Sequence, residues 1–223
     1  MHLALTDRIV CPTCGPGFGL ILLARDVRDR RVQEGDLGCP NCREQYLVAE
    51  GFADLRPPPR DPLPDSPGDS NASPLRPEDT LRLGALIGVT EGPGTVLLCG
   101  PAAAHAEGLA DLIEGIEVVG SWEALALANE REGVSRIAAR SKMPFVSDTF
   151  LGVLVSGEID GEGAAEAARV LSPGGRLVLL DGTSEALPGV SGLDMEVLLR
   201  DGDTLVVKKE GPGSPPLVTL RGL

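Results

Sequence analysis

Apolar residues in the C-terminal two thirds of the chain gather in unbroken runs of strand length. These runs are TVLLCG (95–100), IEVVG (116–120), FLGVLV (150–155) and RLVLLDG (176–182), with a weaker one at VSRIAA (134–139). Segments rich in Ala, Glu and Leu separate them and have a helical pattern. Because continuous apolar runs are typical of strands covered on both faces, the pattern predicts an α/β fold with a mainly parallel sheet between helices.

Different signals mark the two ends of this region. Pro77 followed by EDTLRLGALIGV suits the first turn of a helix, with Leu83 and Ile87 on one face. At the other end, MEVLLRDGDTLVVKK predicts two strands around Asp201 and Gly202. The pattern therefore predicts that the sheet ends in an antiparallel hairpin.

The preceding residues have a different composition. Residues 1–55 contain a strand-like run, GLILLARDV, followed by a polar stretch, RDRRVQEGD, which we expect to form turns. Residues 56–76 are almost all Pro, Asp, Ser, Gly and Arg, and cannot bury enough apolar surface to offset chain entropy. We predict a small module (1–55), a disordered linker (56–76), an α/β domain (77–210) and a C-terminal tail (211–223).

The N-terminal module holds four of the five cysteines in two C-x-x-C pairs. They are Cys11 and Cys14 in CPTCG, and Cys39 and Cys42 in CPNCRE. The spacing lets both thiolates of a pair reach one ion, and four thiolates close a tetrahedron around zinc with no position left for water or substrate. The motif predicts a structural Zn²⁺, whose binding supplies much of the module's folding free energy because the module has few apolar residues.

Charge and hydropathy narrow the classes of partner. The formal net charge is −13, which disfavours a broad electrostatic grip on a nucleic-acid backbone. No apolar run approaches the length needed to cross a bilayer, and the first residues do not resemble a secretion signal. Paired cysteines that suit a metal fit a reducing compartment. We expect a cytoplasmic protein that does not bind a membrane and for which nucleic acid is not the default partner.

The second cysteine pair continues into a recognisable motif. The stretch GDLGCPNCREQYLVAEGFADLR resembles zinc ribbons of the pattern G-x-L-x-C-x-x-C-x-x-x-Y-P-V-x-x-G-I-P-x-L, with Leu47 in place of Pro and Phe52 in place of Ile. Such ribbons are similar to the small zinc-binding activator subunit of tRNA and protein methyltransferases, and also precede the methyltransferase domain in some bacterial enzymes. The resemblance implies contact with a protein partner or presentation of substrate. The alternative is a ribbon that only stabilises its own chain.

Three segments of the α/β region resemble class I S-adenosylmethionine-dependent methyltransferases. They are TVLLCGPAAAHAEGLADL, RIAARSKMPFVSDTFLGVLVSG and AARVLSPGGRLVLLDG, which match the family's glycine loop, its central strand and its R-V-L-x-P-G-G-R-L-V-L-x-D motif. The resemblance implies a Rossmann-like methyltransferase fold. The terminal hairpin fits it, because this fold ends in an antiparallel strand pair.

The positions that would hold the cofactor depart from that pattern. The family places three acidic residues around S-adenosylmethionine, and the alignment puts Leu98, Trp122 and Ala139 there. In the glycine loop only Gly100 matches. Glu123, one residue beyond the expected ribose acid, and Trp122, which could stack on adenine, remain as candidate cofactor ligands together with Gly100.

Two other reactive side chains, His105 and Cys99, have no neighbour in the sequence that would activate them for catalysis. His105 has no carboxylate nearby, and Cys99 lies inside an apolar run without a cation to lower its pKa. We therefore assign no catalytic residue. Three hypotheses remain: a methyltransferase-like scaffold or regulator with a degenerate cofactor site, a divergent active methyltransferase acting on RNA, protein or a small molecule, and a binding module in which the ribbon does the work.

Overall fold

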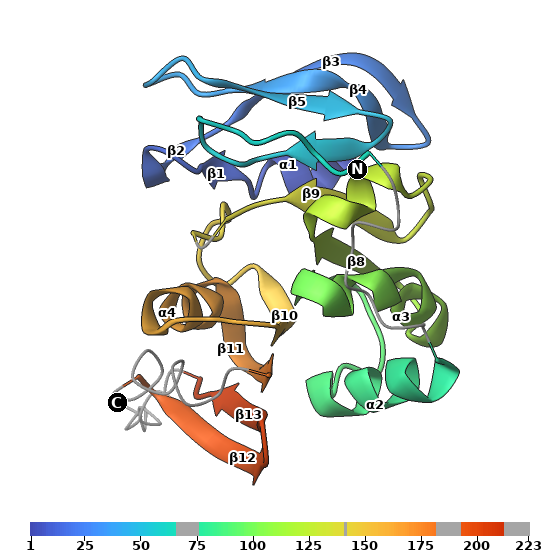
Figure 1. Ribbon diagram of the computed structural model, residues 1–223, viewed down its shortest axis with the longest axis vertical. Coiled ribbons are helices and arrows are strands. Elements are labelled where there is room, and N and C mark those ends of the chain that lie inside the picture. Colours follow the sequence, from blue (N-terminus) through green and yellow to red (C-terminus); the bar gives the residue numbers. More distant parts are fainter. Residues whose placement is uncertain (66–75, 141, 182–192, 212–223) are drawn as a thin grey trace, which may run out of the picture.

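One mixed sheet runs through the whole molecule (Figure 1). The structure is a computed structural model that describes residues 1–65, 76–140, 142–181 and 193–211. Its 11-stranded sheet has the order β12-β13-β11-β10-β7-β8-β9-β6-β5-β4-β3, and a separate two-stranded sheet pairs β1 with β2. The N-terminal strands and the hairpin β12–β13 therefore lie at opposite ends of one continuous sheet.

The strands of the α/β part follow the apolar runs of the sequence. Five neighbouring strands pair in parallel, and two more extend the sheet antiparallel to them. In sheet order these are β9 (Val134–Ala138), β8 (Ile116–Ser121), β7 (Gly94–Cys99), β10 (Phe150–Ser156), β11 (Leu171–Leu180), β13 (Thr204–Lys209) and β12 (Met195–Asp201). The prediction of a mainly parallel α/β sheet with an antiparallel terminal hairpin is confirmed.

Helices cover this sheet unevenly. The covering elements are α2 (Pro77–Ile87), the 3-10 helix η2 (Gly100–His105), α3 (Ala106–Leu112), the 3-10 helix η3 (Glu123–Leu127) and α4 (Gly161–Val170). In α2 the predicted face is buried, since Leu83 and Ile87 are 7% and 1% exposed. The crossover from β8 to β9, expected to be a helix, contains only the short η3, and no helix occurs in the described residues 139–140 and 142–149 between β9 and β10.

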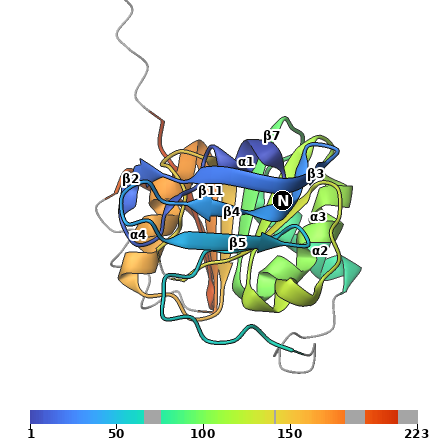
Figure 2. The ribbon, with the colours of Figure 1, turned by 90° about the horizontal axis from the view of Figure 1, so that it is seen from above.

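The N-terminal module is also built mainly of strands. It contains α1 (Leu3–Thr6), β1 (Val10–Cys11), β2 (Gly15–Gly19), β3 (Ile21–Arg28), β4 (Arg31–Gly38), β5 (Gln45–Ala49) and β6 (Phe52–Asp54). Figure 2 looks onto β3, β4 and β5, which lie side by side.

The prediction of turns throughout RDRRVQEGD is wrong. Asp29 and Arg30, with φ angles of 48° and 61°, make the turn between Arg28, the last residue of β3, and residues 31–36, which belong to β4. The strand was not recognised in the sequence because most of its side chains are polar. Its only large apolar residues are Val32 and Leu37, and both are fully buried.

The module joins the α/β part by strand pairing. Strand β6 runs parallel to β9, with Phe52 opposite Arg136 and Asp54 opposite Ala138. The pairing makes the strands of the module a direct continuation of the α/β sheet. Nothing in the apolar pattern of the sequence indicated this pairing.

The start of the chain covers the sheet face that the β9–β10 crossover leaves without a helix. The amide of Val10 donates to the carbonyl oxygen of Pro144 (3.0 Å), and the amide of Val146 donates to that of Arg8 (2.9 Å). Between these bonds, Ile9 and Phe145, each 1% exposed, form a β-bridge within the larger core cluster. Residues of the module thus help to build the core of the α/β part.

The predicted linker and tail are described in part. Residues 56–65 have no helix or strand, and Arg56, at the start of the predicted linker, is 1% exposed. Residues 66–75 of the linker and residues 212–223 of the tail lie outside the described residues. The domain boundaries stay predictions.

Candidate functional site

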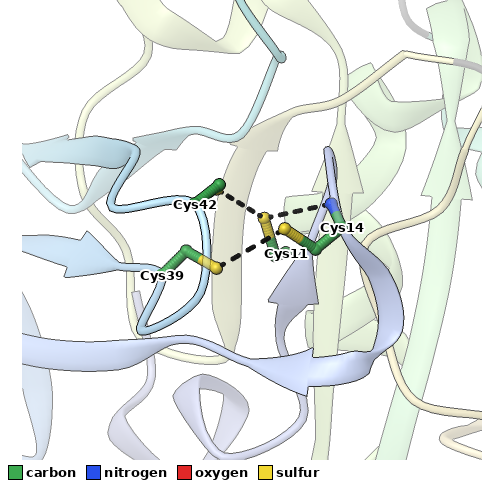
Figure 3. A group of neighbouring side chains, drawn as sticks. All are labelled: Cys11, Cys14, Cys39 and Cys42. Atoms are coloured by element: carbon green, nitrogen blue, oxygen red, sulfur yellow. Dashed lines mark hydrogen bonds between the residues drawn. The ribbon is translucent and has the colours of Figure 1, made fainter.

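The four paired cysteines converge on one point (Figure 3). Cys11 and Cys14 come from β1 and the turn that follows it, and Cys39 and Cys42 come from the loop after β4. All four Sγ atoms lie within 4.8 Å of one another. The sulfur atoms of Cys11 and Cys42 are 3.7 Å apart, and those of Cys14 and Cys39 are 3.9 Å apart.

These distances fit a tetrahedral metal ion. With Zn–S bonds of about 2.3 Å, the sulfur atoms of a zinc tetrahedron lie about 3.8 Å apart. The cluster could therefore bind Zn²⁺, and because all four ligands would come from the protein, the ion would have no open position for a substrate.

Hydrogen bonds hold the thiols in place. The amide of Cys14 donates to Sγ of Cys11 (3.3 Å), and Nδ2 of Asn41 donates to Sγ of Cys14 (3.3 Å). Desolvation raises the pKa of Cys39, but hydrogen bonds from the backbone of Cys42 and Asn41 and from neighbouring thiols outweigh it and bring the pKa to about 7. Cys39 can thus supply thiolate, the form of cysteine that binds metals.

A second candidate site is a cavity of about 620 Å³ at the carboxyl ends of β7, β8, β9 and β10. This is the edge of a parallel sheet at which α/β proteins bind ligands. The three cofactor candidates from the sequence all lie on its wall: Gly100, Trp122 and Glu123. The structure brings them together from the ends of β7 and β8.

The turn that contains Gly100 is closed by a serine of the neighbouring strand. Gly100 has a φ angle of +72°, and a Cβ atom added there would lie 2.2 Å from the carbonyl oxygen of Ser156. The hydroxyl of Ser156 accepts a hydrogen bond from the amide of Ala102 (2.7 Å) and donates to the carbonyl of Cys99 (3.1 Å). Packing against β10 therefore explains this glycine without a ligand.

Glu123 is bound by an arginine from the N-terminal part of the chain. Nη1 of Arg56 lies 3.0 Å from Oε1 of Glu123, and the same guanidinium makes two bonds of 2.8 Å to Asp54. These carboxylates raise the pKa of Arg56, with the hydrogen bond to Asp54 the largest cause. The Glu123 side chain remains 45% exposed. Segment 54–56 therefore helps to fix the one carboxylate that the sequence offered for a ribose.

The three residues at the positions of the family's acids do not all line the cavity. Leu98 is fully buried in the core cluster that includes α2 and α3, and it does not line the cavity. Trp122 and Ala139 do line it. None of the three side chains carries a carboxylate.

The cavity also contains polar residues that the sequence reasoning missed. Glu158 and Asp160 lie on its wall, and Asp160 caps α4 by accepting a hydrogen bond from the amide of Gly163 (2.8 Å). Arg56 was placed in the predicted linker because three prolines follow it directly. An aspartate directly before a segment of helical pattern could have indicated the capping role of Asp160, whereas no local signal indicated Arg56.

Cys99 and His105, which we left without a catalytic role, are in different places. Cys99 lines the cavity, and desolvation raises the pKa of its thiol to about 12, so it is protonated at neutral pH. His105 lies on another cavity, of about 800 Å³, and its Nδ1 is 2.8 Å from Oγ1 of Thr80. Desolvation lowers the pKa of His105.

Comparison with known proteins gives matches only among solved structures. No protein-family model and no curated protein matches the chain. The chain is similar to an S-adenosyl-L-methionine-dependent methyltransferase of Methanococcus maripaludis, at 14% identity over 61% of this chain and 85% of that one, with a TM-score of 0.46.

Two further matches have the same character. The tRNA (m1A58) methyltransferase TrmI of Aquifex aeolicus is 11% identical over 65% of this chain and 72% of that one, with a TM-score of 0.46. A chain of the complex between the Haloferax volcanii Trm112 methyltransferase activator and a methyltransferase is 21% identical over 55% and 70% of the two chains, with a TM-score of 0.44. Independently of these matches, the strand order and the terminal hairpin make the fold methyltransferase-like. In the described part of the chain, no helix is long and apolar enough to span a membrane.

Proposed function

We propose that this chain is a methyltransferase-like protein with a structural zinc ribbon and a degenerate S-adenosylmethionine site. Its role is that of a non-catalytic scaffold or regulator, which acts on a protein partner through the ribbon or the α/β surface. The observation that carries the proposal is the composition of the cavity wall at the ends of β7, β8 and β9. Leu98 is turned into the core, and Trp122 and Ala139 stand where the resemblance expects acids.

The expected loss of affinity is large. A hydrogen bond to a charged group contributes about 1.5–3 kcal/mol, so the loss of two or three costs about 3–9 kcal/mol of binding. A micromolar site, near −8 kcal/mol, would become millimolar or weaker. Closure of the glycine turn adds to this, because the amide of Ala102 already donates to Ser156 and is not free for a ligand.

A second candidate function is that of a divergent but active methyltransferase. The observation that favours it is the presence of Trp122 and Glu123 together on the wall of a cavity of about 620 Å³. Only one oxygen of Glu123 is bonded to Arg56, so the other could accept from a ribose hydroxyl. In that case Glu123 would take over the role of the missing acid.

Calorimetric titration of the zinc-replete chain with S-adenosylmethionine separates the two functions. We expect no saturable binding in the micromolar range. A dissociation constant at or below about 10 μM, near −7 kcal/mol, contradicts the degenerate site. Glu123→Gln is the matched variant: if binding occurs and this variant loses it, the active methyltransferase is favoured, and methyl transfer to RNA, protein and small molecules is then measured.

The structural metal has its own test. Elemental analysis of the purified chain should find one zinc ion per polypeptide. The quadruple substitution of Cys11, Cys14, Cys39 and Cys42 by serine should remove it. A metal content far below one ion per chain in the unmodified protein would contradict the zinc ribbon and leave the calorimetric result unaffected.

A further inference from the structure

A second cavity, of about 800 Å³, lies beside α2 and α3, which pack on the same face of the sheet (Figure 1). It is lined by different residues from those of the cofactor cavity. Val134 and Arg136 contribute to its wall from β9, on one face of the strand because they are two residues apart. The β8–β9 crossover, all of which the structure describes, forms only the five-residue η3 in place of a full helix. The short crossover leaves room for the cavity.

Most of the side chains that line this cavity are apolar. Leu125 and Val134 belong to the core cluster beneath it, whereas Leu81 and Leu112 on the wall are 56% and 45% exposed. Cavities of this volume with mainly apolar walls are typical of sites for small molecules. In such sites a few polar groups determine which ligand is accepted.

Arg136 is the one buried polar side chain among the described residues of the wall, at 3% exposed. Nη1 donates to the carbonyl oxygens of Leu125 (3.0 Å) and Ala128, and Nη2 donates to that of Glu50. Its buried Nε has no hydrogen-bond partner, and the guanidinium forms no ion pair with a carboxylate in the described part of the chain. Desolvation lowers the pKa of Arg136. A buried charge without a counter-charge is unfavourable, so an anion in the cavity would stabilise this arginine.

The other charges of the wall specify the size of that anion's charge. Arg131 pairs with two lining acids, Glu107 and Asp111. The wall has three arginines and two acids in all, so one positive charge is left over in a chain whose net charge is −13. His105 adds none at neutral pH, because desolvation lowers its pKa. One carboxylate balances this charge, whereas a phosphate group, with nearly two negative charges, exceeds it.

We propose that this cavity binds a small amphiphilic carboxylate, in which one carboxylate group is joined to an apolar body. The carboxylate lies beside Arg136 and supplies the missing counter-charge. The apolar body packs against Leu125 and Val134 and is removed from water. An apolar helix of a partner protein would cover Leu81 and Leu112 but would leave Arg136 without an anion. The site is separate from the S-adenosylmethionine cavity, so each is tested on its own.

Decanoate at neutral pH is the probe, and decan-1-ol and decylamine are its neutral and cationic controls. Calorimetric titration of the full chain should show saturable binding of decanoate, tighter than that of decan-1-ol by about tenfold or more because its charge is compensated. Decylamine should bind more weakly than the alcohol. The chain has two histidines, of which His105 lines the cavity and His2 precedes α1. Decanoate should shift the imidazole NMR signals of His105 and leave those of His2 unchanged.

Substitutions of Leu81 test the charge dependence without removing the bonds of Arg136 to η3. Because Leu81 is 56% exposed, both Leu81→Glu and Leu81→Gln should fold, which circular dichroism checks. The two side chains have the same shape, so their difference isolates the charge: Leu81→Glu should bind decanoate about fivefold more weakly than Leu81→Gln. Leu23→Glu, at an equally exposed leucine of β3, is the matched control and should bind decanoate as the unmodified chain does.

Several results overturn the proposal. Decanoate that does not bind saturably, that binds no more tightly than decan-1-ol, or that shifts His2 instead of His105 does so. Equal affinities of Leu81→Glu and Leu81→Gln also overturn it. Binding that occurs only after residues 66–75 are replaced by a glycine–serine linker of equal length overturns it as well, and assigns the cavity to the chain's own segment.

Discussion

At the scale of single residues, Arg56 is the side chain on which the site and the fold depend together. Its buried guanidinium is bonded to Asp54, which is 18% exposed, and to Glu123. Arg56→Met would leave both carboxylates without their partner. Removing one member of a buried ion pair costs several kcal/mol, and since both acids keep some contact with water we expect a loss of about 3 kcal/mol in the free energy of unfolding.

Urea unfolding measures this loss, and Arg140→Met provides the control. Arg140 is 46% exposed and pairs with Asp61, which is 89% exposed. Exposed pairs contribute less than about 1 kcal/mol. Equal losses in the two variants would show that the buried network around Arg56 has no special role.

Gly100 provides a second test at this scale. Gly100→Ala forces alanine into a φ angle of +72° and places Cβ against the backbone of Ser156. Gly174→Ala imposes a similar φ angle of +81° in open space. We expect about 1–2 kcal/mol of destabilisation at Gly174 from the backbone alone. At Gly100 we expect about 1–3 kcal/mol more, from the enforced contact.

Thermal or urea unfolding of both glycine variants gives the difference directly. If the two alanines cost the same, the contact with Ser156 is not what requires glycine at position 100. S-adenosylmethionine binding should be as weak in the Gly100→Ala variant as in the unmodified chain, because the glycine serves packing.

At the scale of elements, the sequence predicted what depends on local pattern. The runs around Val96, Val118 and Leu154 became buried parallel strands, and Asp201 and Gly202 mark the predicted hairpin. The site candidates Gly100, Trp122 and Glu123 lie on one cavity because the ends of neighbouring parallel strands meet at one edge. These features follow from periodicity and turn chemistry, which are visible in a single sequence.

What the sequence did not indicate depends on contacts between distant residues. The sequence of strand β4 is mostly polar. The strand needs few apolar side chains because its backbone forms hydrogen bonds with its neighbours β3 and β5. The Ala/Leu-rich crossover from β8 to β9 was expected to be a helix, but it contains only the five-residue 3-10 helix η3. Arg136, from β9, donates to the carbonyl oxygen of Leu125 (3.0 Å) and to that of Ala128 at the end of η3. Long-range hydrogen bonds of this kind override local propensity.

Strand β1 connects the metal cluster with the cavity wall. Cys11 ends β1, and its neighbour Val10 donates to Pro144, which lines the cavity together with Met143 and Phe145. Loss of the metal should loosen β1 and, through this bond, the cavity wall. Adding a strong chelator should therefore raise amide hydrogen exchange at residues 10 and 143–146, while β11 and β13, which follow β10 in the sheet on the side away from β7, keep their protection.

Cys11→Ser should reproduce the effect of the chelator, and Cys99→Ser is the matched control. Cys99 also lines the cavity but does not belong to the four-thiol cluster. Unchanged exchange at residues 143–146 in the metal-free chain would mean that the wall is held by its own packing, for example by the edge-to-face contact of Phe145 with Phe150 at 4.8 Å.

At the scale of the whole molecule, the N-terminal module is bound to the α/β part by buried charges as well as by strands. Arg31, 5% exposed, donates from Nη1 to both carboxylate oxygens of Glu117 (3.1 and 3.2 Å), and also bonds to Glu130 and to the carbonyl of Val134. In the other direction, Arg136 donates to the carbonyl of Glu50. Each part thus satisfies buried polar groups of the other, and separation would leave them unpaired.

This arrangement predicts that the two parts stay together when the chain between them is cut. A protease site introduced between residues 66 and 75 allows cleavage of the native protein into an N-terminal and a C-terminal fragment. We expect the fragments to elute together in size exclusion even in high salt, because salt screens exposed charges far more than buried pairs or the β6–β9 pairing. After cleavage, the Arg31→Met variant should release the fragments, because Glu117 and Glu130 lose their buried partner. Arg25→Met is the control: it removes an exposed ion pair within the module and should not release them. Fragments of the unmodified sequence that separate under native conditions would contradict a single folding unit, and would make the module a domain that moves independently of the cavity.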